Sequence, residues 1–457
     1  MKKLFVALLL LPFFVACNQE ETGTKITGIF DNLEAGLFIM GDPGGSRDTV
    51  LLNEDNSFEY TYSEIEKPGN YYIISEKDYA LMYIAPGMQL DIYIDKENFI
   101  ESLFFAGAGS DINNYIVDKT RISKQAGAEI YSKDADAFRT YADSLLAVQQ
   151  SLLNEQLKDD IEDSFWLQEE GDLLYGWAQS LSNYPSYHKY YAKVESVELT
   201  ESFSSYKEQL DINSSKYLTS TAFKNYVSLE VREASGAKAK GLEDVNTGLL
   251  RLQTAVEMIT NQDVLNDFLA SAVMGRLQWT ALDELQDEID FLISNCSDTT
   301  RIAEFYVEYE AWKKLAKGQP AFNFEGHDLE GNLVKFSDFK GKYVYVDVWA
   351  TWCGPCVYEI PFLKTLEADY HDRNIVFISY SIDSDKDAWL KYVPENELGG
   401  VQIIGENAWQ SKLAKEFKIV GVPTFMFFDP DGNIINIKMT RPSNQKTRDS
   451  FDSYKDL

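Results

Sequence analysis

The stretch that most constrains the fold of this chain is "WATWCGPC", residues 349–356. It overlaps the end of an apolar run, "YVYVDVWA" (343–350), and leads into the helix-like segment "PCVYEIPFLKTLEADY" (355–370). A buried strand is therefore expected to end, and a helix to begin, at Cys353 and Cys356. Two cysteines at this spacing are typical of half a zinc site, a structural disulfide or a redox couple.

The segment around this pair alternates between strand-like and helix-like runs. The alternation begins at Gln319 and Pro320 and continues to Leu457, which predicts an α/β domain with a mixed sheet over residues 319–457. After the first strand and helix, strands are expected at 374–383, 401–406 and on both sides of the Asp-Gly turn in 421–439, and helices at 384–393, 408–419 and 443–457.

Two other regions precede this domain. Residues 25–107 hold seven short runs rich in Ile, Val, Tyr and Phe, separated by turn signals such as "DPGG" and "KPGN", which predicts an antiparallel all-β sandwich or barrel. Residues 108–318 carry apolar residues at helical spacing and almost no proline, Pro185 being the exception, which predicts an all-α domain. We expect the aromatic cluster 184–191 and its His188 to pack helices together rather than to bind a ligand.

The first residues resemble an export signal. Lys2 and Lys3 precede an apolar run that is too short for a transmembrane helix, and Ala16 then precedes Cys17. This order resembles a bacterial lipobox, which implies a signal peptide at 1–16, a lipid on Cys17 and a tether at 17–24. The alternative is an ordinary cleaved secretory signal. Both alternatives place the protein outside the cytoplasm.

Charge and cysteine content narrow the function. The net charge is −31, and the surplus of acid is spread along the chain, which argues against nucleic acid as a partner. Without Cys17, three cysteines remain, too few for a disulfide-based scaffold. Cys296 is expected to be a buried, inert thiol, with a third exchange thiol as the alternative. Only Cys296 and three histidines are left as further soft ligands, so we expect no metal site and no cofactor.

A redox role for the cysteine pair has a physical basis. A helix N-terminus supplies partial positive charge and free N–H groups, which favour a thiolate on Cys353. Cys353 is therefore the predicted exposed nucleophile, and Cys356, inside the first turn, is the predicted buried resolving thiol. Pro355 suits the first turn of a helix, where its missing N–H costs little.

Two carboxylates are candidates for the proton of the resolving thiol. Asp347 lies in the apolar strand run, where burial raises the proton affinity of a carboxylate. Glu359 follows Cys356 by three positions and can face the same side of the helix. For Asp347, the alternative is a strand residue that faces outward. For Glu359, the alternative is a solvated helix residue.

The segment "GVPT" supplies the predicted substrate-binding residues, together with Trp352 beside the nucleophile. A cis Val422–Pro423 bond at the start of a strand leaves the Val422 backbone free to pair with a substrate chain. A trans proline at the first residue of a strand is the alternative on spacing alone.

Asp347, "WATWCGPC" and "GVPT", in this order, resemble the thioredoxin superfamily over 319–457. The long entry segment, the "CxxCxxExP" run through Glu359 and Pro361, and the "DPDGN" turn resemble the membrane-anchored TlpA/ResA-like thiol-disulfide oxidoreductases. The resemblance implies a thioredoxin fold, Cys353 and Cys356 as the redox pair, a cis Pro423 and Glu359 near the active site. Carrying both Asp347 and Glu359 departs from several TlpA-like members and leaves the proton acceptor open.

The expected function is an exported disulfide reductase. A Gly-Pro dipeptide between the cysteines resembles reducing thioredoxins, so oxidised exported proteins are the expected substrates and a membrane thiol donor the expected electron source. Asn18 after Cys17 favours the outer membrane, facing the periplasm.

Several other functions are open. One is a substrate-binding or redox-sensing lipoprotein, and another is a disulfide oxidase or isomerase. The sequence offers too few ligands for a zinc site. It also lacks the Pro-x-x-x-Thr-x-x-Cys motif of a peroxiredoxin, because Thr351 lies too close to Cys353.

Overall fold

The structure, a computed structural model, describes residues 23–34, 36–41, 47–62, 65, 67–124, 127–157 and 163–457. The predicted signal peptide and Cys17, with most of the tether, lie outside these residues. The chain divides into two compact units, Met1–Asp211 with Thr219–Phe223 and Ile212–Leu218 with Lys224–Leu457. The helices of the predicted all-α region are therefore shared between the two units.

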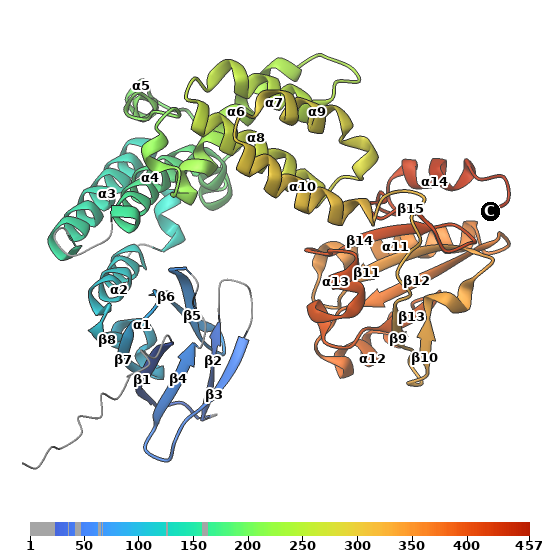
Figure 1. Cartoon of the computed structure of the whole chain (residues 1–457), viewed down its shortest axis with the longest axis horizontal. Helices are drawn as coiled ribbons and strands as arrows, with labels where there is room; N and C mark the ends of the chain where they lie inside the picture. Colours follow the sequence, from blue (N-terminus) through green and yellow to red (C-terminus); the bar gives the residue numbers. More distant parts are fainter. Residues whose placement is uncertain are drawn as a thin grey trace, which may run out of the picture. The chain divides into compact units, whose positions relative to one another are not determined.

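The first unit begins with two four-stranded sheets, in the orders β4-β1-β7-β8 and β3-β2-β5-β6 (Figure 1). Most strands alternate buried and exposed residues, as a sheet with one covered face requires. The strands are β1 (Thr24–Asp31), β2 (Leu37–Gly41), β3 (Arg47–Leu51), β4 (Ser57–Tyr62), β5 (Gly69–Ser75), β6 (Asp78–Ile84), β7 (Gln89–Asp95) and β8 (Phe104–Ala108).

Both sheets contribute side chains to one apolar core, including Phe30 and Ile92 from one sheet and Phe38 and Met82 from the other. The predicted β structure is thus present. The prediction of purely antiparallel pairing is wrong, because β1 and β7 pair in parallel. The chain between them enters the second sheet twice, through β2–β3 and through β5–β6, with β4 of the first sheet in between, so β1 and β7 are not joined by a hairpin and can pair in parallel.

Helices complete the first unit. They include α1 (Phe99–Ser102), α2 (Ser110–Lys124), α3 (Ala135–Leu157), α4 (Asp163–Ala192) and α5 (Glu201–Ser204). Helix α4 continues through Pro185. The aromatic cluster packs as expected, since the ring of Tyr184 contacts those of Phe138 and His188. The Nδ1 of His188 lies 2.8 Å from the carbonyl oxygen of Tyr131, so this histidine has a structural partner.

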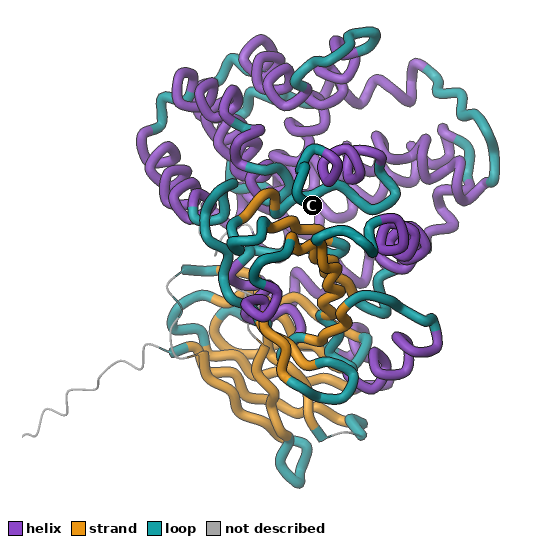
Figure 2. Tube along the Cα trace, turned by 90° about the vertical axis from the view of Figure 1, so that its right-hand side faces the viewer, coloured by secondary structure: helices purple, strands orange, loops and turns teal. Residues whose placement is uncertain are grey.

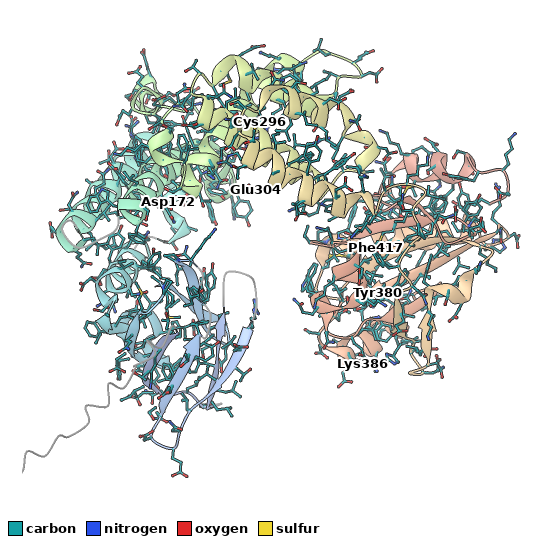
Figure 3. All side chains as sticks on the ribbon, in the orientation of Figure 1. Asp172, Cys296, Glu304, Tyr380, Lys386 and Phe417 are labelled. Carbon is teal, nitrogen blue, oxygen red and sulfur yellow. A yellow bond between two sulfur atoms is a disulfide. The ribbon has the colours of Figure 1, made fainter. Side chains whose placement is uncertain are left out.

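The second unit carries the remaining helices of the predicted all-α region. They are α6 (Thr221–Ala239), which begins in the first unit, α7 (Thr247–Met258), α8 (Gln262–Leu277), α9 (Gln286–Asn295) and α10 (Thr299–Lys313). Asn246, Asn261 and Asp298 cap α7, α8 and α10. Cys296 ends α9 as a buried, free thiol whose Sγ lies 3.9 Å from the carbonyl oxygen of Asp298 (Figure 3). Within the described residues, no helix is long and apolar enough to cross a membrane.

The C-terminal sheet has seven strands in the order β10-β9-β13-β12-β11-β14-β15. The central strands β11, β12 and β13 are parallel, whereas β14 and β15 are antiparallel to their neighbours, as predicted for a mixed sheet. The strands are β9 (Glu325–His327), β10 (Leu333–Lys335), β11 (Tyr343–Trp349), β12 (Ile375–Ser381), β13 (Val401–Ile404), β14 (Thr424–Phe428) and β15 (Ile434–Asn436).

Helices cover both faces of this sheet, and Figure 2 distinguishes its strands from its helices by colour. On one face, Leu363 of α11 and Phe451 of α14 pack on Tyr345 of β11. On the other, Phe417 at the end of α13 contacts Phe428 of β14. The helices are α11 (Gly354–Asp369), α12 (Lys386–Glu395), α13 (Lys412–Glu416) and α14 (Gln445–Asp452). Every residue of β11 is buried, so this strand holds a fixed position for the turn that follows it.

Candidate active site

The turn between β11 and α11 places Cys353 at the N-cap of α11. The Sγ of Cys353 accepts a hydrogen bond from the backbone N–H of Cys356 at 3.1 Å. Pro355 occupies the first helical turn, where its missing N–H leaves no hydrogen bond unmade. The helix N-terminus therefore directs its N–H groups and partial positive charge at this sulfur, which favours a thiolate when the pair is reduced.

Cys353 and Cys356 form a disulfide with Cα atoms 5.2 Å apart. Cys356 is 3% exposed, and Cys353, predicted to be exposed, is only 5% exposed. The difference has a local reason, because the Cys353 sulfur turns into the first helical turn, where it meets both the sulfur and the amide of Cys356.

A buried aspartate that the sequence analysis missed anchors this turn. Asp383, 4% exposed, accepts hydrogen bonds from the Thr351 amide at 3.0 and 3.1 Å and from the Thr351 hydroxyl at 2.8 Å. Ser381 at the end of β12 donates a further bond of 2.7 Å to Asp383. The carboxyl ends of parallel strands meet at one edge of a sheet. The acid that ends "SYSID", directly after a buried strand parallel to β11, was therefore the sequence feature that could have predicted Asp383 at this site.

Asp347 lies in β11, and burial is the main reason why its pKa rises to about 8. The charges of Glu367 and then Glu359 add to the effect. Within the described part of the chain, no residue donates a hydrogen bond to its carboxylate. Glu367 of α11, also missed from sequence, has a pKa raised to about 7 by burial, against the opposing effect of Lys364.

Glu359 is also buried, at 3% exposure, but its carboxylate is engaged. The Ser443 amide donates to it at 3.0 Å and the Ser443 hydroxyl at 2.9 Å, while an Arg441 nitrogen lies 3.9 Å away. The sequence left open that Asp347 faces outward from its strand and that Glu359 is a solvated helix residue. Both alternatives are wrong, because both side chains are buried.

The Val422–Pro423 peptide bond is cis. Thr424, the next residue, opens β14 and pairs with Val348 near the end of β11. The register therefore brings the Val422–Pro423 segment to the sheet edge from which the cysteine turn leaves. Val422 forms no backbone hydrogen bond with any described residue, so its N–H and C=O are available to an incoming chain.

Exposed apolar side chains lie near this edge. Trp352, directly before Cys353, is 57% exposed, and its ring centroid lies 6.3 Å from that of Trp409. Trp279, which follows α8 in the same unit, is 62% exposed, and its ring packs against Gly421. Exposed aromatic rings of this kind are common where proteins bind other chains.

Helix α10 also contacts the segment before Pro423. Lys418 forms an ion pair of 2.9 Å with Glu308 and lies 5.5 Å from the ring centroid of Trp312. Lys438 lies over the same ring at 5.2 Å, and burial lowers its pKa to about 8. These contacts belong to one compact unit, so helices outside the C-terminal sheet border the predicted substrate-binding segment.

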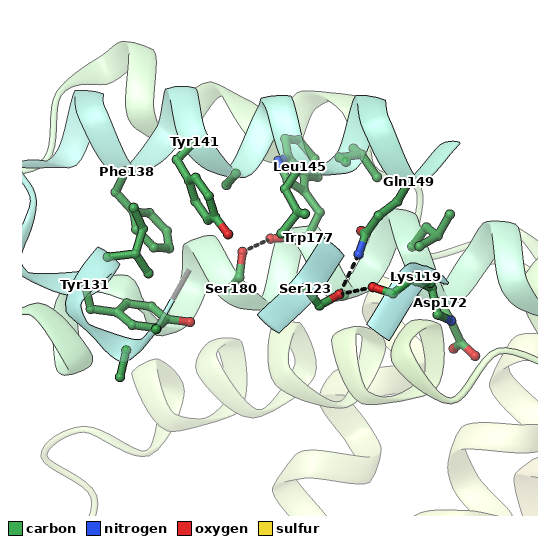
Figure 4. A pocket seen from close by; sticks show the side chains of 17 residues that line it. Lys119, Ser123, Tyr131, Phe138, Tyr141, Leu145, Gln149, Asp172, Trp177 and Ser180 are labelled. Carbon is green, nitrogen blue, oxygen red and sulfur yellow. Dashed lines mark hydrogen bonds between the residues drawn. The ribbon is translucent and has the colours of Figure 1, made fainter. Parts of the chain in front are cut away.

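The first unit contains a separate cavity of about 420 Å³ between α2, α3 and α4 (Figure 4). Aromatic rings, including those of Tyr141 and Trp177, line it together with a few polar groups. Several of those polar groups already have partners: Lys119 pairs with Glu169, and Asp172 accepts hydrogen bonds from the Ser220 hydroxyl and the Ala222 amide. The cavity therefore offers a ligand mainly apolar contacts.

Comparisons with known proteins find matches to the C-terminal part of the chain. The Redoxin family model matches residues 316–454. The thiol-disulfide oxidoreductase ResA of Bacillus thuringiensis is 28% identical over 142 residues, which span 31% of this chain and 78% of ResA. A proposed thiol-disulfide oxidoreductase from Bacteroides vulgatus, known from a crystal structure, is 38% identical, with 31% of this chain and 97% of that chain covered and a TM-score of 0.29. The thioredoxin domain of another thiol-disulfide oxidoreductase from that organism is 30% identical, with 30% and 96% covered and a TM-score of 0.28.

A cysteine pair that opens a helix after the central strand of a mixed sheet, beside a cis proline, defines a redox module of the thioredoxin superfamily. Within that superfamily, residues 316–454 belong with the TlpA/ResA-like thiol-disulfide oxidoreductases.

Proposed function

We propose that this chain reduces disulfides in other exported proteins through Cys353 and Cys356. The observation that carries the proposal is the disulfide at the N-terminus of α11, at the sheet edge where Val422 presents an unpaired backbone. The helix N-terminus stabilises the attacking thiolate, and a free backbone segment can pair with a polypeptide substrate.

The reaction starts from the reduced pair. The Cys353 thiolate attacks one sulfur of the substrate disulfide, forms a mixed disulfide and releases the other sulfur as a thiolate, which takes up a proton. Cys356 then loses its proton, attacks the Cys353 sulfur and releases the second substrate thiol. The substrate gains two electrons and two protons, and Cys353–Cys356 becomes a disulfide that a thiol donor must reduce again.

Asp347 is the proposed acceptor of the Cys356 proton. It is buried, no described residue donates a hydrogen bond to it, and its pKa of about 8 lies near that of a thiol. Glu359, held by Ser443, is then a structural carboxylate near the pair.

Reduction is the proposed direction because a Gly-Pro dipeptide separates the two cysteines. Thioredoxin itself has a potential of about −270 mV, against about −120 mV for a strong oxidant. Oxidase or isomerase activity is the alternative within the same chemistry.

The chain is further proposed to be anchored by a lipid on Cys17 in the outer membrane and to face the periplasm, with a membrane thiol protein as electron donor. The order of Lys2, Lys3, the apolar run, Ala16 and Cys17 supports the anchor. Cys17→Ser is expected to move the protein from the membrane to the soluble fraction, with Cys296→Ser as a matched control. Membrane retention of both variants would contradict the anchor.

Insulin reduction driven by dithiothreitol tests the activity. We expect the wild type to accelerate precipitation of the insulin B chain and Cys353→Ser to fall to the uncatalysed rate. Equal rates for the two proteins would exclude the reductase. The apolar cavity of the first unit supports a second candidate, a lipoprotein that binds an apolar molecule, and that candidate predicts such equal rates.

A further inference from the structure

A cavity of about 250 Å³ lies among four helices of the second unit, α6, α7, α8 and α9. Each helix contributes one charged side chain to its lining: Arg232 from α6, Arg251 from α7, Arg276 from α8 and Glu288 from α9. The other lining residues are mostly small or apolar, so these four side chains set the charge of the cavity.

The arginines are close enough to affect one another. Burial, followed by the charges of Arg232 and Arg276, lowers the pKa of Arg251. Arg251 stacks at 5.4 Å from the ring centroid of Phe268, and one Nη donates to the Ser228 hydroxyl at 2.6 Å. Its Nε is buried and has no hydrogen-bond partner among the described residues. Like charges held together in this way cost free energy unless an anion offsets them.

Among the described residues that line the cavity, one carboxylate stands beside the three guanidinium groups. Glu288, 1% exposed, lies 2.9 Å from the Nε of Arg276 through one oxygen, while its other oxygen accepts no hydrogen bond from any residue that the structure describes. Neither Arg232 nor Arg251 forms an ion pair with any carboxylate in the described part of the chain. The cavity thus has a net charge of about +2 when Glu288 is ionised.

This excess is notable because the chain has 73 acidic and 42 basic side chains. With so many carboxylates, arginines that serve only to stabilise helix packing have acidic partners at hand, as Arg301 has in Asp267 at 2.8 Å. Two neighbouring arginines without such a partner, at one cavity, indicate that their counter-charge comes from outside the chain.

We propose that Arg232, Arg251 and Arg276 bind a phosphate-class dianion in this cavity. Guanidinium groups match the oxygen geometry of phosphate through paired N–H donors. A dianion balances a charge of about +2, which a single monocarboxylate does not. The cavity volume suits a phosphate group, either free or as the end of a small phosphate monoester. This site is independent of the cysteine pair and of the proposed reductase activity.

The test uses the full chain in detergent at constant ionic strength, with inorganic phosphate, phenyl phosphate and acetate as probes. Isothermal titration is expected to show saturable binding of phosphate at pH 8, competition by sulfate and no binding of acetate. Tighter binding of phenyl phosphate than of phosphate would assign the site to a monoester, and equal binding would assign it to the free ion.

Two variants locate the site. Arg251→Met and Arg232→Met are each expected to weaken phosphate binding at least tenfold, whereas Arg373→Met, at an exposed arginine of the redox module, leaves it unchanged. Arg232 is exposed, so its variant tests the site even if Arg251→Met fails to fold. Removing Arg232 also relieves repulsion, so the midpoint of thermal unfolding without phosphate should stay the same or rise. Phosphate binding no stronger than that of acetate, or equal binding by all variants, would overturn the proposal.

Discussion

The carboxylate of Glu359 accepts two hydrogen bonds from Ser443, one from its amide at 3.0 Å and one from its hydroxyl at 2.9 Å. This arrangement ties α11 to the segment before α14. It also engages the Glu359 carboxylate in hydrogen bonds, close to the cysteine pair. Asp347, a second buried acid of the site, lacks such donors among the described residues and has a pKa of about 8. The two acids therefore have different roles in our account.

Asp347→Asn is expected to slow the resolution of the mixed disulfide by Cys356 and to remove the pH dependence of that rate. The wild-type carboxylate accepts a proton only when it is ionised, so its rate should rise as pH passes through about 8. Stopped-flow measurement of mixed-disulfide resolution from pH 6 to 9 checks this expectation. An unchanged profile in the variant would assign the proton to another group.

The same substitution should stabilise the fold at pH 7. The pKa of Asp347 is raised from 3.8 to about 8, so between these values the folded protein binds a proton that the unfolded chain lacks, and stability falls as pH rises. Removing the acid should add roughly 2–4 kcal/mol at pH 7 and little below pH 4. Urea unfolding at pH 4 and pH 7 gives the difference, and a gain of equal size at both pH values would contradict the assigned titration.

Ser443→Ala should act on stability and leave chemistry in place. It removes one of the two hydrogen bonds to a buried carboxylate, which costs about 1–3 kcal/mol. Urea unfolding measures that cost, and the pH profile of insulin reduction should keep its rise near pH 8. A shift of that profile in the variant would mean that Glu359, and not Asp347, takes the proton.

Asp383→Asn tests the anchor of the active-site turn. The carboxylate accepts from both the amide and the hydroxyl of Thr351, so the variant should lose about 1–3 kcal/mol of stability and at least tenfold in kcat/KM for insulin. Asp385→Asn is the matched control, because Asp385 lies two residues after Asp383 and its carboxylate caps α12. If both variants behave alike, Asp383 has no special part in positioning the cysteines.

Trp279→Ala separates protein substrates from small ones. Trp279 lies against Gly421 beside the segment proposed to pair with substrate. Trp is enriched among the interface residues whose truncation costs about 1 kcal/mol or more, so KM for insulin should rise about fivefold. The rate with a small aromatic disulfide should not change. A parallel loss with both substrates would point to disturbance of the module itself.

Local patterns predicted the redox module well. The apolar strand run, Pro355 and the spacing of the cysteines led to β11 and α11 at nearly their observed positions. Asp383 and Ser443 were missed because they reach the site through strand order and a distant loop, which a linear sequence does not display. The parallel pairing of β1 and β7 was missed for the same reason. The engagement of Glu359 depends on a partner 84 positions away.

The reduction potential of the Cys353–Cys356 pair tests the central claim most directly. It is measured on the full chain by equilibration against glutathione and dithiothreitol buffers, with Cys296→Ser as a control for the remaining thiol. A value at or below about −250 mV is the result we predict, because it makes the pair a net reductant of exported disulfides. A value above about −180 mV would contradict the account and make the protein an oxidase or isomerase.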